Sequence, residues 1–113
     1  MFRRYVWKPL KCALWGIKFA CGDRSFRLEI LLGVIFFPFF AFKFWGDLKL
    51  LLLSLGYFII LIAESINCAI EKAVDFTSRD IHPLAKQAKD IASAAVLLAL
   101  LNFTLISIYC FFN

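Results

Sequence analysis

Long apolar stretches dominate the chain, and polar residues divide them into segments of membrane-spanning length. The pattern predicts three transmembrane helices at about 28–45, 48–70 and 90–112, because a span needs roughly 17–25 predominantly apolar residues. Lipid offers no hydrogen-bond partner for unpaired backbone groups, so helices are the expected structure. We therefore expect an all-α integral membrane protein that forms one domain over residues 1–113.

An amphipathic segment precedes the first predicted span. At about 9–22, Leu10, Leu14 and Ile17 recur at helical spacing, while Lys11 and Lys18 lie on the other side. A helix beginning near residue 9 would have a proline at its first position, where proline is well tolerated. The pattern predicts a surface helix in the membrane interface. This helix could be a charged anchor that fixes topology, or the floor or lid of a site at the membrane surface.

Composition fits a bilayer and excludes a small water-soluble core. Of 113 residues, 63% are hydrophobic and fourteen are Phe, which is more apolar surface than one small domain can bury. Seven of the thirteen basic residues precede the first span, and four more lie between residues 72 and 89. The positive-inside rule therefore predicts that the N-terminus and the 72–89 loop are cytoplasmic, with the 43–49 turn and the C-terminus outside.

Charge and cysteine content narrow the function classes further. The net charge of +5 is concentrated beside the predicted spans, which suits anionic lipid headgroups and gives no indication of nucleic-acid binding. The basic N-terminal stretch lacks an uninterrupted apolar segment, so we expect no cleaved signal peptide. The cysteines have no spacing typical of a zinc site or redox motif, and we expect free thiols at Cys12, Cys21, Cys68 and Cys110.

A stripe of polar side chains interrupts the second apolar run. Glu64, Asn67 and Glu71 are spaced i, i+3 and i+7, so they share one face of a helix, with Asp75 one turn further on. Ionisable groups close to hydrocarbon are costly and usually functional. The stripe therefore indicates a cation site, and a metal ion carrying phosphate is the candidate cation.

Phosphate chemistry at this stripe would depend on side chains. The sequence contains neither a P-loop nor a Gly-rich kinase loop, and His82 is its only histidine. A metal would therefore need oxygen ligands, which suit Mg²⁺ and which Asp23 and Glu71 can supply. Phosphoryl transfer also needs a cation on the developing charge and a carboxylate that accepts a proton. Glu64, about 10 Å of helix rise from Glu71, is placed to reach a lipid hydroxyl.

A structural explanation of the acids stays open beside this chemical one. The acids could simply end the second span and begin the first. Those of the second span would then pair with Lys72, Arg79 and Lys89, and those of the first with Arg24 and Arg27.

The polar stripe is part of a longer motif. Residues 63–75 read A-E-S-I-N-C-A-I-E-K-A-V-D, and residues 82–95 read H-P-L-A-K-Q-A-K-D-I-A-S-A-A. This combination, E-x-x-N-x-A-I-E-x-x-V-D followed by A-K-D, resembles the small prokaryotic diacylglycerol kinase family, which also contains the undecaprenol kinases. Residues 23–29 resemble the family's E-x-x-F-R-x-E segment, with Asp23 where the family usually has Glu. The resemblance extends over residues 16–99.

The resemblance implies a homotrimeric helical bundle with active sites shared between neighbouring subunits at the cytoplasmic face. It implies Glu64 as the general base toward the lipid hydroxyl, and Asp23 and Glu71 as ligands of the Mg²⁺ that accompanies ATP. The residues implied to hold the nucleotide are Asp80, His82, Lys89 and Asp90, with Lys89 on phosphate. The residues implied to surround the lipid head are Arg27, Glu29, Asn67 and Ser93. Ahead of the matching segment, further candidates for nucleotide or substrate contact are Arg4 and Lys11.

The activity implied by the resemblance is ATP-dependent phosphorylation of diacylglycerol to phosphatidic acid in the bacterial inner membrane. Glu29 after Phe26 and Arg27, together with Pro38 in the first span, resembles the diacylglycerol kinases of Gram-negative bacteria more than the undecaprenol kinases, and this resemblance implies diacylglycerol as the substrate. Undecaprenol is the alternative lipid. The alternative from another class is a non-catalytic small membrane subunit, which would leave the acidic stripe without a role.

Overall fold

Four α-helices make up the protein in the computed structural model, which describes residues 6–77 and 82–113. They are α1 (Lys8–Ala20), α2 (Arg24–Lys43), α3 (Leu48–Thr77) and α4 (Pro83–Phe112). α2, α3 and α4 are each long and apolar enough to cross a membrane. The structure therefore confirms the expected all-α architecture, with one short helix followed by three helices of spanning length.

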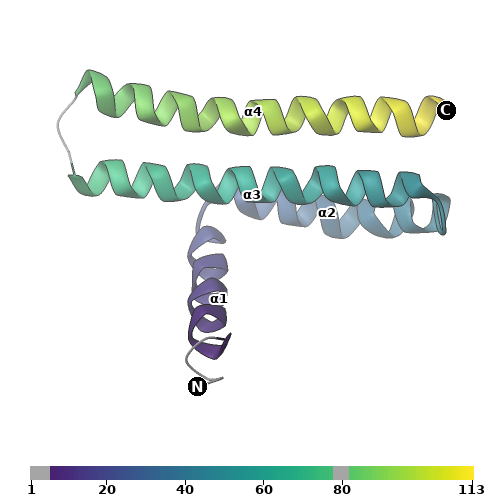
Figure 1. Cartoon of the computed structure of the whole chain (residues 1–113), viewed down its shortest axis with the longest axis horizontal. Coiled ribbons are helices and arrows are strands. Elements are labelled where there is room, and N and C mark those ends of the chain that lie inside the picture. The colour runs from purple at the N-terminus through teal and green to yellow at the C-terminus, as the bar shows by residue number, and fades with distance from the viewer. Residues whose placement is uncertain (1–5, 78–81) are drawn as a thin grey trace.

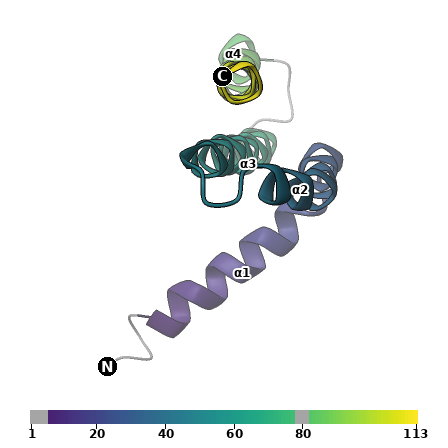
Figure 2. The same ribbon diagram turned by 90° about the vertical axis from the view of Figure 1, so that its right-hand side faces the viewer.

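The helix α3 forms the centre of the molecule. α4 runs beside it along its length, and α2 lies against another side of it (Figure 1). Viewed along the long helices, α3 lies between α4 and α2 (Figure 2). α1 runs across the direction of the long helices, and its Phe19 ring lies 5.9 Å from Lys72 Nζ of α3. This is the orientation expected of a helix lying in a membrane interface beside helices that span the membrane.

Local sequence signals explain where the helices begin and end. The Asp23 side chain caps α2 by accepting a hydrogen bond from the backbone N–H of Ser25 at 3.2 Å. Between α2 and α3 the chain reverses at Gly46, whose φ of +77° lies in the left-handed region that glycine adopts without strain. Asp47 then accepts from the N–H of Lys49 at 3.2 Å in the first turn of α3.

α3 and α4 extend beyond the apolar segments that marked them in the sequence, whereas α1 and α2 begin and end earlier than predicted. α1 occupies Lys8–Ala20 against the predicted 9–22, and α2 occupies Arg24–Lys43 against 28–45. The larger differences lie where α3 and α4 approach each other, because α3 continues to Thr77 and α4 already begins at Pro83. Hydropathy reports only the part of a helix suited to lipid, whereas the backbone hydrogen bonds continue through the polar turns beyond it.

A compact apolar cluster lies near the turn between α2 and α3. Phe44, Leu53 and Cys110 are buried there and pack against four partly buried neighbours, which are Phe40, Leu50, Phe103 and Ile106. Elsewhere most large apolar side chains are exposed, and Phe26 is the only buried residue of α2. Outward-facing apolar surface of this extent is suited to lipid or to other protein helices. All four cysteines are free thiols, as expected.

Candidate functional site

The polar stripe of α3 is buried in the structure. Glu64 is only 4% exposed and Asn67 only 7%, and these are the two buried polar or charged residues of the described chain. The Asn67 amide donates to Glu71 Oε1 at 3.4 Å, one turn along the helix. The Asn67 Oδ1 atom is buried without a hydrogen-bond partner. The spacing that placed these three residues on one face is therefore confirmed, and this face points into the protein.

Two acids of α2 come close to this stripe. The Glu64 carboxylate lies within electrostatic range of Asp23 and Glu71, and the Glu29 carboxylate within range of Glu64 and Asp23. Glu29 Oε2 is buried and has no partner within the described ranges. Four negative side chains thus gather where the start of α2 meets α3, and we call Asp23, Glu29, Glu64 and Glu71 the carboxylate cluster. Such a cluster is repulsive unless a cation or protons offset its charge.

None of the described basic residues suggested by the structural explanation forms an ion pair with the cluster, and Arg79 lies outside the described residues. That explanation does hold for one acid of the second span, because Asp75 pairs with Lys89. In residues 6–77 and 82–113, none of the four carboxylates forms a salt bridge, so neither Arg24 nor Arg27 pairs with Asp23 or Glu29. Asp23 does have a structural contact, since its Oδ1 atom caps α2. No group of three Asp, Glu, His or Cys side chains in the described part of the chain could hold a metal ion by itself. A metal bound here would need ligands from phosphate and water as well as from protein.

The residues expected to hold a nucleotide lie at the ends of α3 and α4 that the 78–81 segment joins. Lys89 Nζ contacts Asp75 Oδ1 at 2.6 Å, which links α4 to α3. Lys86 Nζ contacts Asp90 Oδ2 at 2.7 Å within α4. His82 caps α4, with its Nδ1 atom accepting from the backbone N–H of Leu84 at 3.1 Å. The ion pairs of Lys89 and Asp90 are solvent-exposed, so both side chains are accessible to a ligand.

The remaining candidates are not all placed in the carboxylate cluster. Arg27 and Ser93 are exposed, and neither makes a side-chain hydrogen bond or ion pair in the described part of the protein. Lys11 lies on the basic side of α1 beside Trp15. Asp80 and Arg4 fall outside the described residues. One chain therefore brings together the acids of the expected site, whereas Lys89 pairs with Asp75 and with none of those acids among the described residues.

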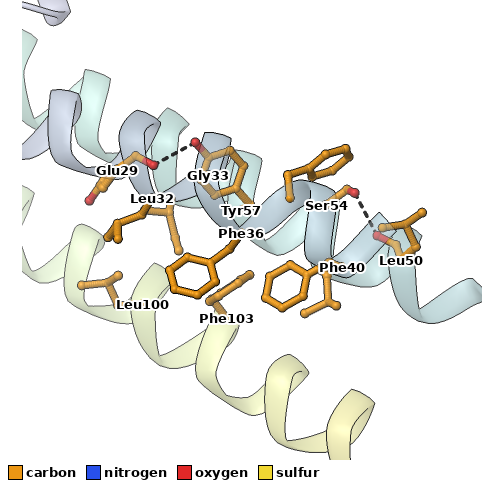
Figure 3. Close-up of a pocket in the computed structure, with 13 residues that line it drawn as sticks. Glu29, Leu32, Gly33, Phe36, Phe40, Leu50, Ser54, Tyr57, Leu100 and Phe103 are labelled. Carbon is orange, nitrogen blue, oxygen red and sulfur yellow. Dashed lines mark hydrogen bonds between the residues drawn. The ribbon is translucent and has the colours of Figure 1, made fainter. Parts of the chain in front are cut away.

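Sequence reasoning missed one contact that positions the acids. The Tyr57 hydroxyl donates to the main-chain oxygen of Glu29 at 2.9 Å, joining α3 to α2 (Figure 3). A Cβ atom at Gly33 would overlap the Tyr57 ring, so this close approach requires glycine. Two signals in the sequence point to such a contact. A phenol within a span needs a hydrogen-bond partner, and glycine within a span often marks close helix packing.

A cavity of about 350 Å³ opens between α2, α3 and α4 next to this contact. Its walls are almost entirely apolar, and Glu29 is its only ionisable carboxylate. Figure 3 shows Phe36, Phe40 and Phe103 lining it beyond the Glu29 and Tyr57 pair. An apolar cavity beside a carboxylate cluster can accommodate a molecule with an apolar body and a polar head.

Comparison with known proteins gives consistent similarity over nearly the whole chain. Residues 11–111 match the family described as prokaryotic diacylglycerol kinase. A diacylglycerol kinase of Helicobacter pylori strain 26695 is 42% identical over 111 residues, covering 93% of this chain and 82% of the relative. The diacylglycerol kinase of Escherichia coli K12 is 35% identical over 104 residues, covering 86% and 75%. That of Pseudomonas aeruginosa is 38% identical over 84 residues, covering 74% and 68%.

Proposed function

Because this chain belongs to the prokaryotic diacylglycerol kinase family of lipid kinases, we propose that it transfers the γ-phosphate of Mg-ATP to the hydroxyl of diacylglycerol. The observation that carries this proposal is the burial of Glu64 among three other carboxylates, with no salt-bridge partner in the described chain. The cluster lies where α3 passes α1, which suits a substrate whose head reaches the membrane surface. Phosphatidic acid and ADP would be the products.

Glu64 is the general base in this mechanism. Its carboxylate accepts the proton of the lipid hydroxyl as the hydroxyl oxygen bonds to the γ-phosphorus and ADP departs. Burial supports this role, because water is excluded from the carboxylate and a positioned hydroxyl can take its place. Asn67 lies one turn away with an unpartnered Oδ1 atom, and Glu29 has an unpartnered Oε2 atom. Both can accept hydrogen bonds from a lipid head, with Arg27 and Ser93 assigned to its outer side.

Asp23 and Glu71 would hold the metal of the nucleotide. Their oxygen atoms are the hard ligands that Mg²⁺ prefers, and neither forms a salt bridge in the described part of the protein. A Mg²⁺ ion typically takes one or two carboxylates together with phosphate and water, which fits a site that lacks three protein ligands. Held by Asp23 and Glu71, the ion would supply positive charge that offsets the charge developing on the phosphates during transfer.

The nucleotide would be held by Lys89, Asp90, His82 and Asp80. Lys89 is assigned to the phosphates of the nucleotide. To bind them, Lys89 would give up its exposed ion pair with Asp75. An exposed pair of this kind contributes about 0–1 kcal/mol, so the exchange is inexpensive compared with binding a multiply charged phosphate. In one subunit Lys89 pairs with Asp75 and not with the carboxylate cluster.

This separation supports a homotrimer in which active sites are shared between subunits. Neighbouring chains could bring the Lys89 group of one subunit to the carboxylate cluster of another. The exposed apolar faces of α2 and α4 offer surface for such packing. We propose that the protein lies in the bacterial inner membrane, with its N-terminus and active site cytoplasmic and its C-terminus outside. The distribution of basic residues supports this orientation.

Turnover assays in mixed micelles test the proposal. Purified protein given Mg-ATP should release ADP only when a lipid alcohol is present, and diacylglycerol should be a better substrate than undecaprenol. Excess EDTA should abolish turnover, since it removes the divalent cation that Asp23 and Glu71 would hold. Faster turnover of undecaprenol would overturn the assignment of the lipid. If neither lipid stimulated ADP release by a folded protein, the chain would be a non-catalytic subunit.

A further inference from the structure

The contact between Tyr57 and α2 is unlike the other contacts of that helix. The bond from the Tyr57 hydroxyl to the Glu29 main-chain oxygen is the only side-chain hydrogen bond between α2 and α3 in residues 6–77 and 82–113. The other contacts of α2 are mostly apolar, apart from that of Lys43 with the Phe111 ring of α4, and Phe26 is the only buried residue of α2. In lipid, apolar contacts between helices fix their relative position poorly, because acyl chains can replace them. The Tyr57 bond therefore fixes where along α3 the Glu29 turn lies.

Gly33 makes this bond possible. In an α-helix the N–H of Gly33 bonds to the carbonyl of Glu29, and a side chain at Gly33 would stand over the space beside that carbonyl. Here the Tyr57 ring occupies that space, and a Cβ on Gly33 would overlap its hydroxyl oxygen and Cζ atom. The close-up shows the hydroxyl directed at the Glu29 carbonyl, while the Glu29 side chain extends away from the ring (Figure 3).

The position of this turn matters because the Glu29 side chain is incompletely satisfied. Its Oε2 atom is buried without a partner in the described chain, and the carboxylate lies near Glu64 and Asp23. Buried polar atoms of proteins are nearly always hydrogen-bonded, so an orphaned acceptor suggests a missing donor. A lipid hydroxyl that enters from the adjoining apolar cavity is a donor of suitable chemistry.

We propose that Tyr57 is a positioning residue for the lipid substrate. Its hydroxyl holds the Glu29 turn of α2 against α3, so that the Glu29 carboxylate meets the lipid head beside Glu64. Tyr57 itself need not touch the substrate. The inference rests on the proposed function in one respect, the assignment of Glu29 to the lipid head.

Replacing Tyr57 by Phe tests the role of the hydroxyl while keeping the ring. Tyr57→Phe should raise the KM for diacylglycerol about three- to tenfold, the effect of losing roughly one hydrogen bond, with the KM for Mg-ATP unchanged. Tyr109→Phe is the matched control, since Tyr109 lies at the far end of α4 and its hydroxyl makes no hydrogen bond in the described chain. The control should match wild type. An unchanged lipid KM in Tyr57→Phe would overturn the proposal.

A double-variant comparison separates positioning from simple structural support. Tyr57 bonds to the main chain of residue 29, so Glu29→Ala removes the carboxylate but keeps the bond. If Tyr57 acts through the carboxylate, Tyr57→Phe should have no further effect on the lipid KM in the Glu29→Ala background. If Tyr57 only supports the fold, its effect should persist in that background, and this result would overturn the proposal.

Substitution of Gly33 provides a second, independent variant. Gly33→Ala should displace the Tyr57 ring and raise the lipid KM at least as much as Tyr57→Phe, whereas Gly16→Ala, with open space around it, should not. A wild-type lipid KM in Gly33→Ala would contradict the proposal. A wild-type protein without diacylglycerol-dependent ADP release would instead contradict the proposed function. The two failures are therefore distinguishable.

Discussion

The two ends of the helix bundle differ in how completely their polar side chains find hydrogen-bond or charge partners. At the end with the turn between α2 and α3, apolar packing dominates, and we call this the turn end. Leu53 and Cys110 are each 2% exposed there, and the Phe44 and Phe111 rings pack edge to face at 5.4 Å. Lys43 Nζ lies 4.6 Å from the Phe111 ring centroid, so even this charge has an aromatic partner. At the opposite end lies the carboxylate cluster.

Polar groups at the turn end have partners. Asp47 accepts from a backbone N–H, and the Ser54 and Ser107 hydroxyls donate to carbonyls one turn earlier, both at 2.8 Å. Within residues 6–77 and 82–113, the two buried side-chain atoms without a partner, Glu29 Oε2 and Asn67 Oδ1, both lie by the carboxylate cluster. An unsatisfied buried group costs about 1–3 kcal/mol. The contrast indicates that the turn end contributes stability, whereas the cluster is arranged for a ligand.

Among substitutions at the two ends, Glu64→Gln should have the largest effect on turnover. The substitution keeps size and hydrogen bonding but removes the group that can accept the lipid proton. Turnover should fall by about 10²–10⁴, with Mg-ATP binding and oligomeric state retained. Single-turnover rates and nucleotide binding would be measured on the same preparation.

The matched control lies at the turn end. Asp47→Asn makes the same carboxylate-to-amide change, and asparagine retains an oxygen that can accept from Lys49 N. Its turnover should equal that of wild type. Wild-type turnover in a folded Glu64→Gln protein would exclude Glu64 as the base. Loss of folding in that variant would favour a structural role for the carboxylate.

Leu53→Ala should lower stability and leave kcat unchanged, and because Leu53 also lines the apolar cavity, the lipid KM is the only kinetic constant expected to respond. Leu53 is buried in the turn-end cluster, so truncation leaves a void that its neighbours fill only in part. We expect a loss of about 2 kcal/mol in the free energy of unfolding, at the low end for such substitutions because lipid can relax into part of the space. Denaturant unfolding in micelles measures this, with Leu97→Ala at an exposed position as the control. A lower kcat in the folded fraction would show that the two ends are coupled.

Glu71→Ala should weaken metal binding, and its effect should be smaller than that of Glu64→Gln. The Mg²⁺ concentration for half-maximal rate should rise by at least about tenfold, since removing even a group that only orients a metal ligand has an effect of that size. Asp23→Ala should act in the same direction but more mildly, because the Asp23 side chain is short and also caps α2. Asp23→Glu restores the longer acid and should be neutral or improve the rate. Unchanged Mg²⁺ dependence in Asp23→Ala would exclude Asp23 as a ligand.

Much of the fold could be predicted from the sequence because single helices leave local signals. Apolar length predicted the three long helices, and amphipathic spacing predicted α1. The spacing of Glu64, Asn67 and Glu71 likewise placed them correctly on one face. The ends of α3 and α4 were less predictable, because the helices continue through polar residues where hydropathy no longer marks them.

The assembled site depends on contacts between helices, which spacing along the chain does not encode. The approach of Glu29 to Glu64 depends on how α2 packs on α3, and hence on the bond between Tyr57 and the Glu29 backbone. The motif assigned Asp23 to the metal and gave no attention to its place before a helix, where Asp is one of the preferred capping residues. The roles assigned to the site residues stay predictions that the variants above are designed to test.

Asp75→Asn should have the smallest effect, and it distinguishes two roles for Lys89. The Asp75 and Lys89 side chains are 65% and 39% exposed, so their ion pair should contribute less than about 1 kcal/mol to stability. If Lys89 binds phosphate, Asp75 competes with the nucleotide for it, and Asp75→Asn should leave the KM for Mg-ATP unchanged or slightly lower. Lys89→Gln should instead raise that KM clearly, because it removes the cation itself. Equal losses in the two variants would show that Lys89 acts only as the partner of Asp75 in joining α4 to α3.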